Sequence, residues 1–202
     1  FNPPPTRRES EEAPAGPVPV HTRLRAAGRG SPLATQASSS SRRDTGHRKG
    51  PEMMLKDKVA VIYGAGGAIG GAVARAFASE GAKLFLTGRS LAPVEVVAKD
   101  VVAAGGSAEA AEVDALDEQA VDKHLQSVID KAGRVDISFN AVGIPDTKIV
   151  GVPLVELDVE QFSLPITTYA TSYFLTARVA ARRMVANKSG VIMTVTALHS
   201  RT

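Results

Sequence analysis

The stretch VAVIYGAGGAIG, from Val59 to Gly70, decides the fold of this 202-residue chain. Its first five residues are apolar and follow the charged residues Lys56 to Lys58, which is typical of a strand buried on both faces. Four glycines follow within seven residues, and a helical pattern begins directly after them. A strand, a glycine loop and a helix in this order predict a tight turn whose backbone N–H groups can approach a phosphate.

The rest of the chain repeats the alternation of strand and helix. Further strands are predicted at residues 83–87, 108–113, 135–139 and 191–195. Helices with apolar faces toward the core are predicted from the stripes Ile69, Val73, Phe77; Val94, Val97, Val101; Val121, Leu125, Val128, Ile129; and Tyr173, Ala177, Ala181, Met184. Strands joined by helices of this length form parallel sheets with right-handed crossovers. We predict an α/β, Rossmann-like, doubly wound sheet, cut short after its fifth strand.

The basic charge of the chain belongs to its first part. Residues 1–52 contain 9 Lys and Arg, 5 Asp and Glu, and 8 of the 12 prolines, whereas residues 53–202 contain 15 basic and 16 acidic residues. The first segment shows no helical or strand periodicity and cannot bury enough apolar surface to offset its ordering entropy. We predict a disordered tail over residues 1–52 and an incomplete nucleotide-binding domain over residues 53–202.

Three interpretations of the tail remain open. Its arginines could contact phosphates, since nonspecific nucleic-acid binding needs little more than positive charge. It could be a targeting peptide, although its glutamates and eight prolines are unusual for one. We favour the third interpretation, non-native or upstream-translated sequence before Met53 or Met54, because the folded pattern begins there.

Several classes of function are excluded by composition. The absence of cysteine excludes disulfides, cysteine-ligated zinc and a thiol nucleophile. No run of 18 apolar residues exists, which argues against a membrane-spanning helix. We expect a cytoplasmic protein with no metal site, no membrane partner and, since the basic charge lies in the tail, no nucleic-acid partner.

The glycine loop resembles the T-G-x-x-x-G-I-G loop of the short-chain dehydrogenase/reductase family. Gly64, Ile69 and Gly70 match, while Tyr63 replaces the threonine and Ala68 the middle glycine. The resemblance covers residues 55–202.

Two later segments carry the same resemblance. Val113 and Asp114 are similar to the aspartate segment that contacts adenine after the third strand of the family. The stretch VDISFNAVG over residues 135–143 resembles the family's D-hydrophobic-hydrophobic-x-N-N-A-G-I, with Asn140 and Gly143 matching and Ala141 and Val142 departing. The resemblance implies a dinucleotide site formed by Gly64, Gly66, Gly67, Ala68, Ile69, Gly70, Arg89, Val113, Asp114, Asn140, Ala141 and Gly143.

The cofactor is expected to be NADP rather than NAD. The second strand ends in TGRS over residues 87–90, with no carboxylate that would bind an NAD ribose and repel a 2′-phosphate. The Arg89 guanidinium suits that phosphate. A solvated arginine at the start of a helix is the alternative.

The resemblance also implies an activity, hydride transfer between NADP(H) and a small carbonyl or alcohol substrate. The family handles the proton with the tyrosine of a Y-x-x-x-K motif and holds the substrate oxygen with a serine. No such motif occurs in this chain, and we assign no catalytic residue. Ala197 falls at the serine position, Thr196 or Ser200 could replace it in a shifted register, and Tyr169 falls near the family's helix asparagine.

We therefore expect the chain to descend from oxidoreductases and to be inactive alone. Two alternatives remain open. The chain could be a non-catalytic nucleotide-binding module, or it could bind nucleic acid through its tail. Asp146 and His199 could contact substrate or be ordinary loop residues. A family-type homo-oligomer would use the helix at about residues 160–186, with part of that interface missing. Strand 191–195 would present an unpaired edge.

Deleting residues 1–52 should leave cofactor affinity and thermal stability unchanged, because the segment is predicted to contribute nothing to the core. Fluorescence titration with NADPH and a thermal melt of both chains measure this. A drop in either quantity would show that the tail belongs to the functional domain.

Overall fold

The structure is a computed structural model that describes residues 53–144 and 149–196. The described residues belong to one compact unit, Arg48–Thr202. The predicted disordered tail lies outside the described residues, as do Asp146, Ala197, His199 and Ser200.

The part of the chain that the structure describes contains five parallel strands, which form one sheet in the order β3-β2-β1-β4-β5. They are β1 (Val59–Tyr63), β2 (Lys83–Gly88), β3 (Ser107–Glu112), β4 (Ile137–Asn140) and β5 (Val191–Thr194). The chain adds β2 and β3 on one side of β1 and then crosses to the other side for β4. The order of strands reverses beside β1, where sheets of this kind bind ligands outside their carboxyl ends. The predicted Rossmann-like parallel sheet is confirmed.

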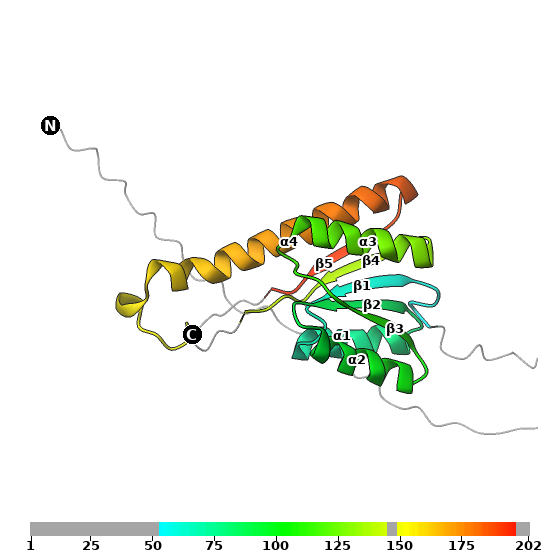
Figure 1. The fold of residues 1–202 in the computed structure, drawn as a ribbon, viewed down its shortest axis with the longest axis horizontal. Coiled ribbons are helices and arrows are strands. Elements are labelled where there is room, and N and C mark those ends of the chain that lie inside the picture. The colour runs from blue at the N-terminus through cyan, green and yellow to red at the C-terminus, as the bar shows by residue number, and fades with distance from the viewer. Residues whose placement is uncertain (1–52, 145–148, 197–202) are drawn as a thin grey trace, which may run out of the picture. The chain divides into compact units, whose positions relative to one another are not determined.

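Within the described residues, four α-helices cover the two faces of the sheet. They are α1 (Ala68–Ser79), α2 (Leu91–Ala103), α3 (Glu118–Ala132) and α4 (Val159–Asn187), with a short 3-10 helix, η1 (Leu154–Glu156), before α4. Figure 1 shows α1 and α2 on one face, α3 and α4 on the other, and the first half of α4 projecting beyond the carboxyl ends of the strands. Among the described helices, none combines the length and apolar character needed to span a membrane.

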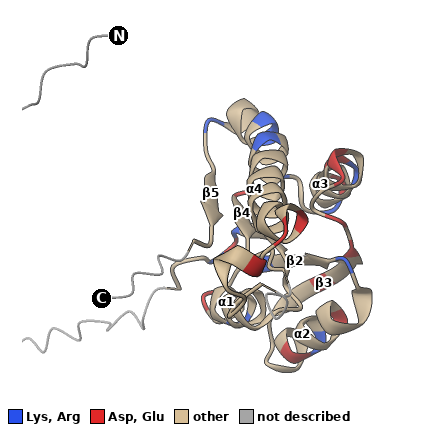
Figure 2. Ribbon diagram, turned by 90° about the vertical axis from the view of Figure 1, so that its left-hand side faces the viewer, with Lys and Arg blue, Asp and Glu red and all other residues tan. Residues whose placement is uncertain are grey.

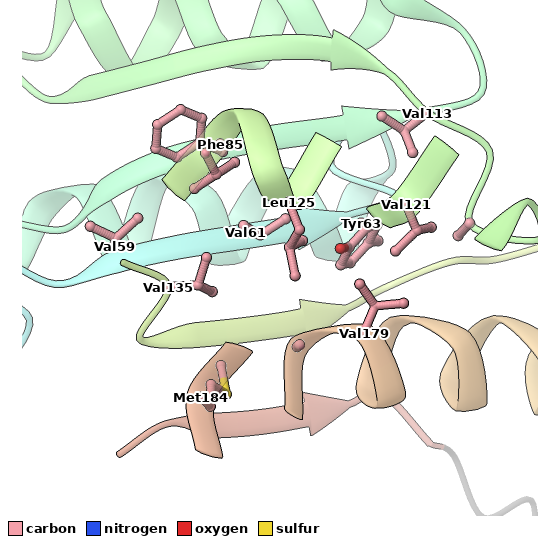
Figure 3. Packing of buried hydrophobic residues seen from close by; sticks show 13 residues of the cluster. Val59, Val61, Tyr63, Phe85, Val113, Val121, Leu125, Val135, Val179 and Met184 are labelled. Atoms are coloured by element: carbon pink, nitrogen blue, oxygen red, sulfur yellow. The ribbon is translucent and has the colours of Figure 1, made fainter. Parts of the chain in front are cut away.

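The central strand β1 has no polar face, as predicted. Val59, Val61 and Tyr63 point into the cluster beneath α3 and α4, which Figure 3 shows. Ala60 and Ile62 point into the cluster beneath α1 and α2. All five are at most 5% exposed. Burial of one such valine or isoleucine side chain contributes roughly 1.5–3 kcal/mol, so this strand anchors both halves of the core.

Strand β4 begins two residues later than the predicted segment 135–139. The preceding residue, Asp136, is 5% exposed and its carboxylate accepts the backbone N–H of Val59 at 2.9 Å. The same carboxylate pairs with the Arg134 guanidinium. A buried carboxylate needs such partners, and here they fix the start of β4 against the start of β1.

The predicted core face of α4 was wrong. Of Tyr173, Ala177, Ala181 and Met184, only Met184 is buried. The buried face carries the apolar residues Leu175, Val179, Ala180 and Met184 together with the hydroxyl residues Thr168, Ser172 and Thr176. Sequence periodicity misplaced the face because three of its positions are polar and hydrogen bonding, rather than hydrophobicity, satisfies them.

Ion pairs link α4 to the adjacent helix α3. Arg178 and Arg182 both pair with Glu118, and Arg183 pairs with Asp122 at 3.0 Å. Figure 2 shows the basic residues of α4 beside the acidic residues of α3. A hollow of ≈ 940 Å³ is lined by four of these charged residues, Glu118, Asp122, Arg182 and Arg183, together with Leu116, Asp117, Gln119 and Lys123.

We expect the buried His124, on α3, to lower the stability of the folded protein at mildly acidic pH. Its Nδ1 is buried with no hydrogen-bond partner among the described residues. Burial lowers the pKa of His124 to about 4, the nearby Lys131 adds to this, and Glu109 opposes it. The unfolded chain takes up this proton near pH 6.5, so stability falls as the pH drops from there toward 4. We expect this group alone to lower the free energy of unfolding by about 2 kcal/mol between pH 7 and pH 5.

Urea unfolding of the full chain at the two pH values, with and without His124→Gln, measures this contribution. The His124→Gln substitution should remove most of the pH-dependent loss in the free energy of unfolding that we assign to His124. His47→Gln, in the segment predicted to be disordered, is the matched control and should not. An equal pH dependence in the wild type and His124→Gln would contradict the assignment.

Candidate functional site

The loop between β1 and α1 requires glycine at several positions because neighbouring atoms leave no room for a side chain there. Gly64 has a φ of +72°, and a Cβ on it would lie 2.6 Å from the carbonyl oxygen of Ala141. A Cβ on Gly70 would collide with the carbonyl oxygen of Gly64, and one on Gly66 would lie 2.9 Å from the Cβ of Pro93. The loop is therefore a bare backbone cradle that a ligand can approach closely.

Backbone hydrogen bonds hold this loop in place. The Ala65 N–H donates to the Thr87 carbonyl at 2.9 Å, and the Gly67 N–H donates to the Gly64 carbonyl at 3.1 Å. Helix α1 then begins at Ala68, without a side chain that caps it. The first N–H groups of a helix have no acceptor within it, and the helix dipole gives this end partial positive charge. The arrangement suits a diphosphate.

Ile69 lies at the rim of the sheet rather than in the core. It is 55% exposed, whereas Val73 and Phe77 of the same stripe pack against the cluster beneath α1 and α2. The predicted core position of Ile69 was wrong because the first turn of α1 stands above the strand ends. Its predicted place beside the glycine loop agrees with the structure.

Two adjoining cavities form one groove along the strand ends. A cavity of ≈ 700 Å³ lies over the glycine loop, and a narrower pocket of ≈ 70 Å³ lies toward Asp114. Both have Gly64, Gly88, Arg89 and Gly143 in their walls. The groove walls include ten of the twelve residues predicted for the site: Gly64, Gly66, Gly67, Ala68, Ile69, Arg89, Val113, Asp114, Ala141 and Gly143. The buried Gly70 lies beneath the loop.

Arg89 lies in the middle of this groove, directly after β2. It is exposed, and no carboxylate among residues 53–144 and 149–196 forms an ion pair with it. The next residue, Ser90, is the N-cap of α2 and makes no side-chain capping bond. The groove therefore presents an unpaired positive charge at the start of a second helix.

Asp114 lies in a tight turn after β3. Its Oδ1 accepts the Leu116 N–H at 2.9 Å and its carbonyl accepts the Asp117 N–H at 3.1 Å. The preceding residue, Val113, is buried and its N–H donates to the Gly88 carbonyl at 2.9 Å. The turn therefore holds the exposed carboxylate at the narrow end of the groove.

Asn140 is the twelfth predicted residue, and its side chain is turned away from the groove. It is 1% exposed, its Nδ2 donates to the Thr176 hydroxyl at 3.0 Å, and its Oδ1 accepts the Val142 N–H at 2.9 Å. The Val195 N–H donates to its carbonyl at 3.1 Å. Asn140 thus positions the wall formed by Ala141 and Gly143.

Sequence reasoning missed three polar or rigid residues of the groove, namely Ser90, Pro93 and Thr168. Ser90 and Pro93 follow Arg89 closely, so the start of α2 could have been included with it. Thr168 gives no signal in the sequence because it lies outside the apolar stripe that predicts the buried face of α4.

At the end of β5, two tyrosines of α4 lie near the strand. The rings of Tyr169 and Tyr173 are 6.0 Å apart, and the Tyr173 hydroxyl donates to the Val195 carbonyl. Burial raises the pKa of Tyr173, and Tyr169 adds to the effect. Thr196, the described candidate for a substrate-holding hydroxyl, is exposed. The described residues contain no cluster of metal-binding side chains.

Comparison with known proteins agrees with this geometry. The family model described as short chain dehydrogenase matches residues 58–202. The 3-oxoacyl-[acyl-carrier-protein] reductase of Synechocystis sp. is 28% identical over 145 residues, covering 71% of this chain and 57% of the relative. The 7alpha-hydroxysteroid dehydrogenase of Escherichia coli is 30% identical over 146 residues, covering 72% and 55%. The chain spans little more than half the length of these relatives.

Solved structures give the same answer. A metagenomic short-chain oxidoreductase in complex with NADP is 32% identical, with a TM-score of 0.64 over 72% of this chain and 64% of that one. A hydroxysteroid dehydrogenase from Escherichia coli is 29% identical, with a TM-score of 0.63 over 74% and 61%. With the family matched over residues 58–202, on this sheet order and glycine loop, the chain belongs to the short-chain dehydrogenase/reductase family.

Proposed function

We propose that the groove binds NADP(H) and that the protein belongs to an NADP-dependent oxidoreductase acting on a small carbonyl or alcohol. The observation that carries this proposal is the continuity of the groove from the bare N-terminus of α1, past Arg89, to Asp114. Its three features suit a diphosphate, a ribose 2′-phosphate and a base, in that order along the strand ends.

The choice of NADP over NAD rests on Arg89. An NAD-specific site places a carboxylate at the end of the second strand to bind the ribose hydroxyls, and the sequence here is TGRS. Arg89 has no ion-pair partner among the described residues, so its guanidinium is available to a phosphate. The metagenomic relative in complex with NADP, at 32% identity, is consistent with this choice.

The residues of this chain would bind and orient the cofactor. Gly64 and Gly70 leave the space that a diphosphate needs, and the N–H groups at the start of α1 offset its charge. Asn140 holds the Ala141–Gly143 wall against that loop. Bound NADP(H) supplies the hydride chemistry, and the wall formed by Ala141 and Gly143 limits access to one side of the groove.

The residues that would handle the proton are not present as a motif. Tyr63, Tyr169 and Tyr173 are followed four residues later by Gly67, Tyr173 and Ala177, so none has the family's lysine. We therefore propose that the 202-residue chain binds cofactor without turnover. This makes a non-catalytic nucleotide-binding module the second candidate, favoured by the engagement of the Tyr173 hydroxyl with the Val195 carbonyl.

The substrate class is proposed only as carbonyl or alcohol. The names of the two relatives, an acyl-carrier reductase and a steroid dehydrogenase, refer to very different molecules. We also propose a family-type association through α4, because Phe162, Ile166 and Phe174 on this helix are each more than half exposed.

Arg89→Ala should weaken NADPH binding by about 10- to 100-fold, which is the range for losing charge-assisted hydrogen bonds. NADH binding should change little, because NADH has no 2′-phosphate. Fluorescence titration of both nucleotides measures the two affinities. Lys99→Ala, on the exposed side of the same helix that Arg89 precedes, is the control and should match the wild type. Equal wild-type affinities for NADPH and NADH would refute the NADP assignment.

The purified 202-residue chain should not reduce a panel of ketones and aldehydes with NADPH faster than Gly64→Asp does. In that variant an acidic side chain is forced into the diphosphate cradle at a residue with φ of +72°. Circular dichroism would establish that the variant is folded, and NADPH absorbance follows turnover. A wild-type rate clearly above the variant would show that another group replaces the missing tyrosine and lysine.

A further inference from the structure

The hydroxyl of Tyr63 has no hydrogen-bond partner among the residues that the structure describes. Tyr63 is the last residue of β1 and is fully buried, yet its Oη forms no hydrogen bond with any described group. Figure 3 shows its ring beside Val121 and Leu125 of α3 and Val179 of α4. Every other residue of this buried cluster is apolar. The hydroxyl therefore lies in an apolar environment between the sheet and the two helices that cover it.

Other buried polar side chains near this cluster show the usual arrangement. The Asn140 Nδ2 donates to the Thr176 hydroxyl at 3.0 Å, and that hydroxyl donates to the Ser172 carbonyl at 2.8 Å. Tyr63 differs from them although it is equally well shielded from water. Burial raises the pKa of Tyr63 far above its ordinary value, so the phenol stays protonated and neutral at physiological pH. Tyr63 thus carries an unused neutral donor rather than a buried charge.

An unused buried donor favours any state of the protein in which water reaches it. Burying a hydroxyl without a hydrogen bond is unfavourable, because its desolvation is not compensated. A phenylalanine would fill the same position with the same ring and without this penalty. The penalty applies while α3 and α4 cover β1 and disappears when the cover moves away. The hydroxyl therefore lowers the free energy needed to open this side of the core.

Helix α4 is the covering element whose first half has little apolar attachment. Its residues in the buried cluster are Val179, Ala180 and Met184, all in its second half. The buried positions of its first half are Thr168 and Ser172, and Figure 1 shows this half projecting beyond the carboxyl ends of the strands. The ion pairs of α4 with α3 are partly exposed, and such pairs contribute little to stability. Segments with few buried apolar contacts open locally at a lower free energy than the whole domain.

We propose that the Tyr63 hydroxyl acts as a conformational device, which lets α4 open from the sheet while the rest of the domain stays folded. Opening breaks the bond between Asn140 and Thr176 and lets water reach the phenol, which then forms the hydrogen bonds that it lacks in the closed state. Because Asn140 holds the Ala141–Gly143 wall and α4 contributes Thr168 to the groove, opening of α4 also loosens the groove. The inference rests on the fold alone and holds whichever ligand the groove binds.

The test is hydrogen–deuterium exchange of the 202-residue chain, followed by mass spectrometry in the regime where exchange reports the opening equilibrium. Amides of α4 should exchange faster than those of β1. Tyr63→Phe, which removes the hydroxyl and keeps the ring, should slow the exchange of α4 by about 5- to 50-fold, the range for removing an unpaired buried hydroxyl. Tyr173→Phe is the matched control. It removes a hydroxyl that donates to the Val195 carbonyl, so the exchange of α4 should stay the same or become faster.

The other outcomes overturn the inference. If Tyr63→Phe leaves the exchange of α4 unchanged or makes it faster, the hydroxyl is paired in the folded state or stays buried when α4 opens. If α4 and β1 exchange at the same rate in the wild type, α4 does not open separately. A loss of the thermal transition in Tyr63→Phe would show that the hydroxyl stabilises the fold. Equal slowing by Tyr63→Phe and Tyr173→Phe would show that the effect does not depend on an unpaired donor.

Discussion

The close approach of two backbone segments at the carboxyl ends of β1 and β4 governs the rest of the structure. The Cα of Gly64 faces the Ala141 carbonyl so closely that no side chain fits between them. This contact brings the glycine loop against the loop after β4, and the groove runs beside it. Because β1 and β4 are adjacent only where the order of strands reverses, the topology creates the contact and the glycine permits it.

A buried hydrogen-bond network maintains this approach from behind. Asn140 connects its own strand end, the Val142 backbone and the Thr176 hydroxyl on α4. Its carbonyl also receives the N–H of Val195, at the end of β5. A polar group in this position is stable only when all its bonds are made. The position of α4, and with it Thr168, is therefore coupled to the shape of the groove.

The sequence predicted what depends on local pattern and missed what depends on packing between distant segments. The strand β1 and the glycine loop could be predicted because five apolar residues and four glycines each have one physical interpretation in that order. The buried face of α4 could not be predicted, because its buried positions include the polar residues Thr168, Ser172 and Thr176. A sequence pattern does not show that Thr176 accepts a hydrogen bond from Asn140, 36 residues away. The motif that includes Asn140 places this residue at the end of β4 but does not show that its side chain bonds to Thr176 and to the Val142 backbone.

The walls of the groove come from elements other than β5, an edge strand of the described sheet. The residues that line the groove lie after β1, β2, β3 and β4 and on α4, and each of these elements contributes residues to the core clusters or packs against them. Strand β5 is an edge strand with Val191 and Ile192 at least 40% exposed. Its Met193 packs against the cluster beneath α1 and α2, and Val195, directly after the strand, donates its N–H to the Asn140 carbonyl. The described residues that line the groove include none from β5. Strand β5 therefore supports the groove from behind, through the contact of Val195 with Asn140, rather than forming part of its wall.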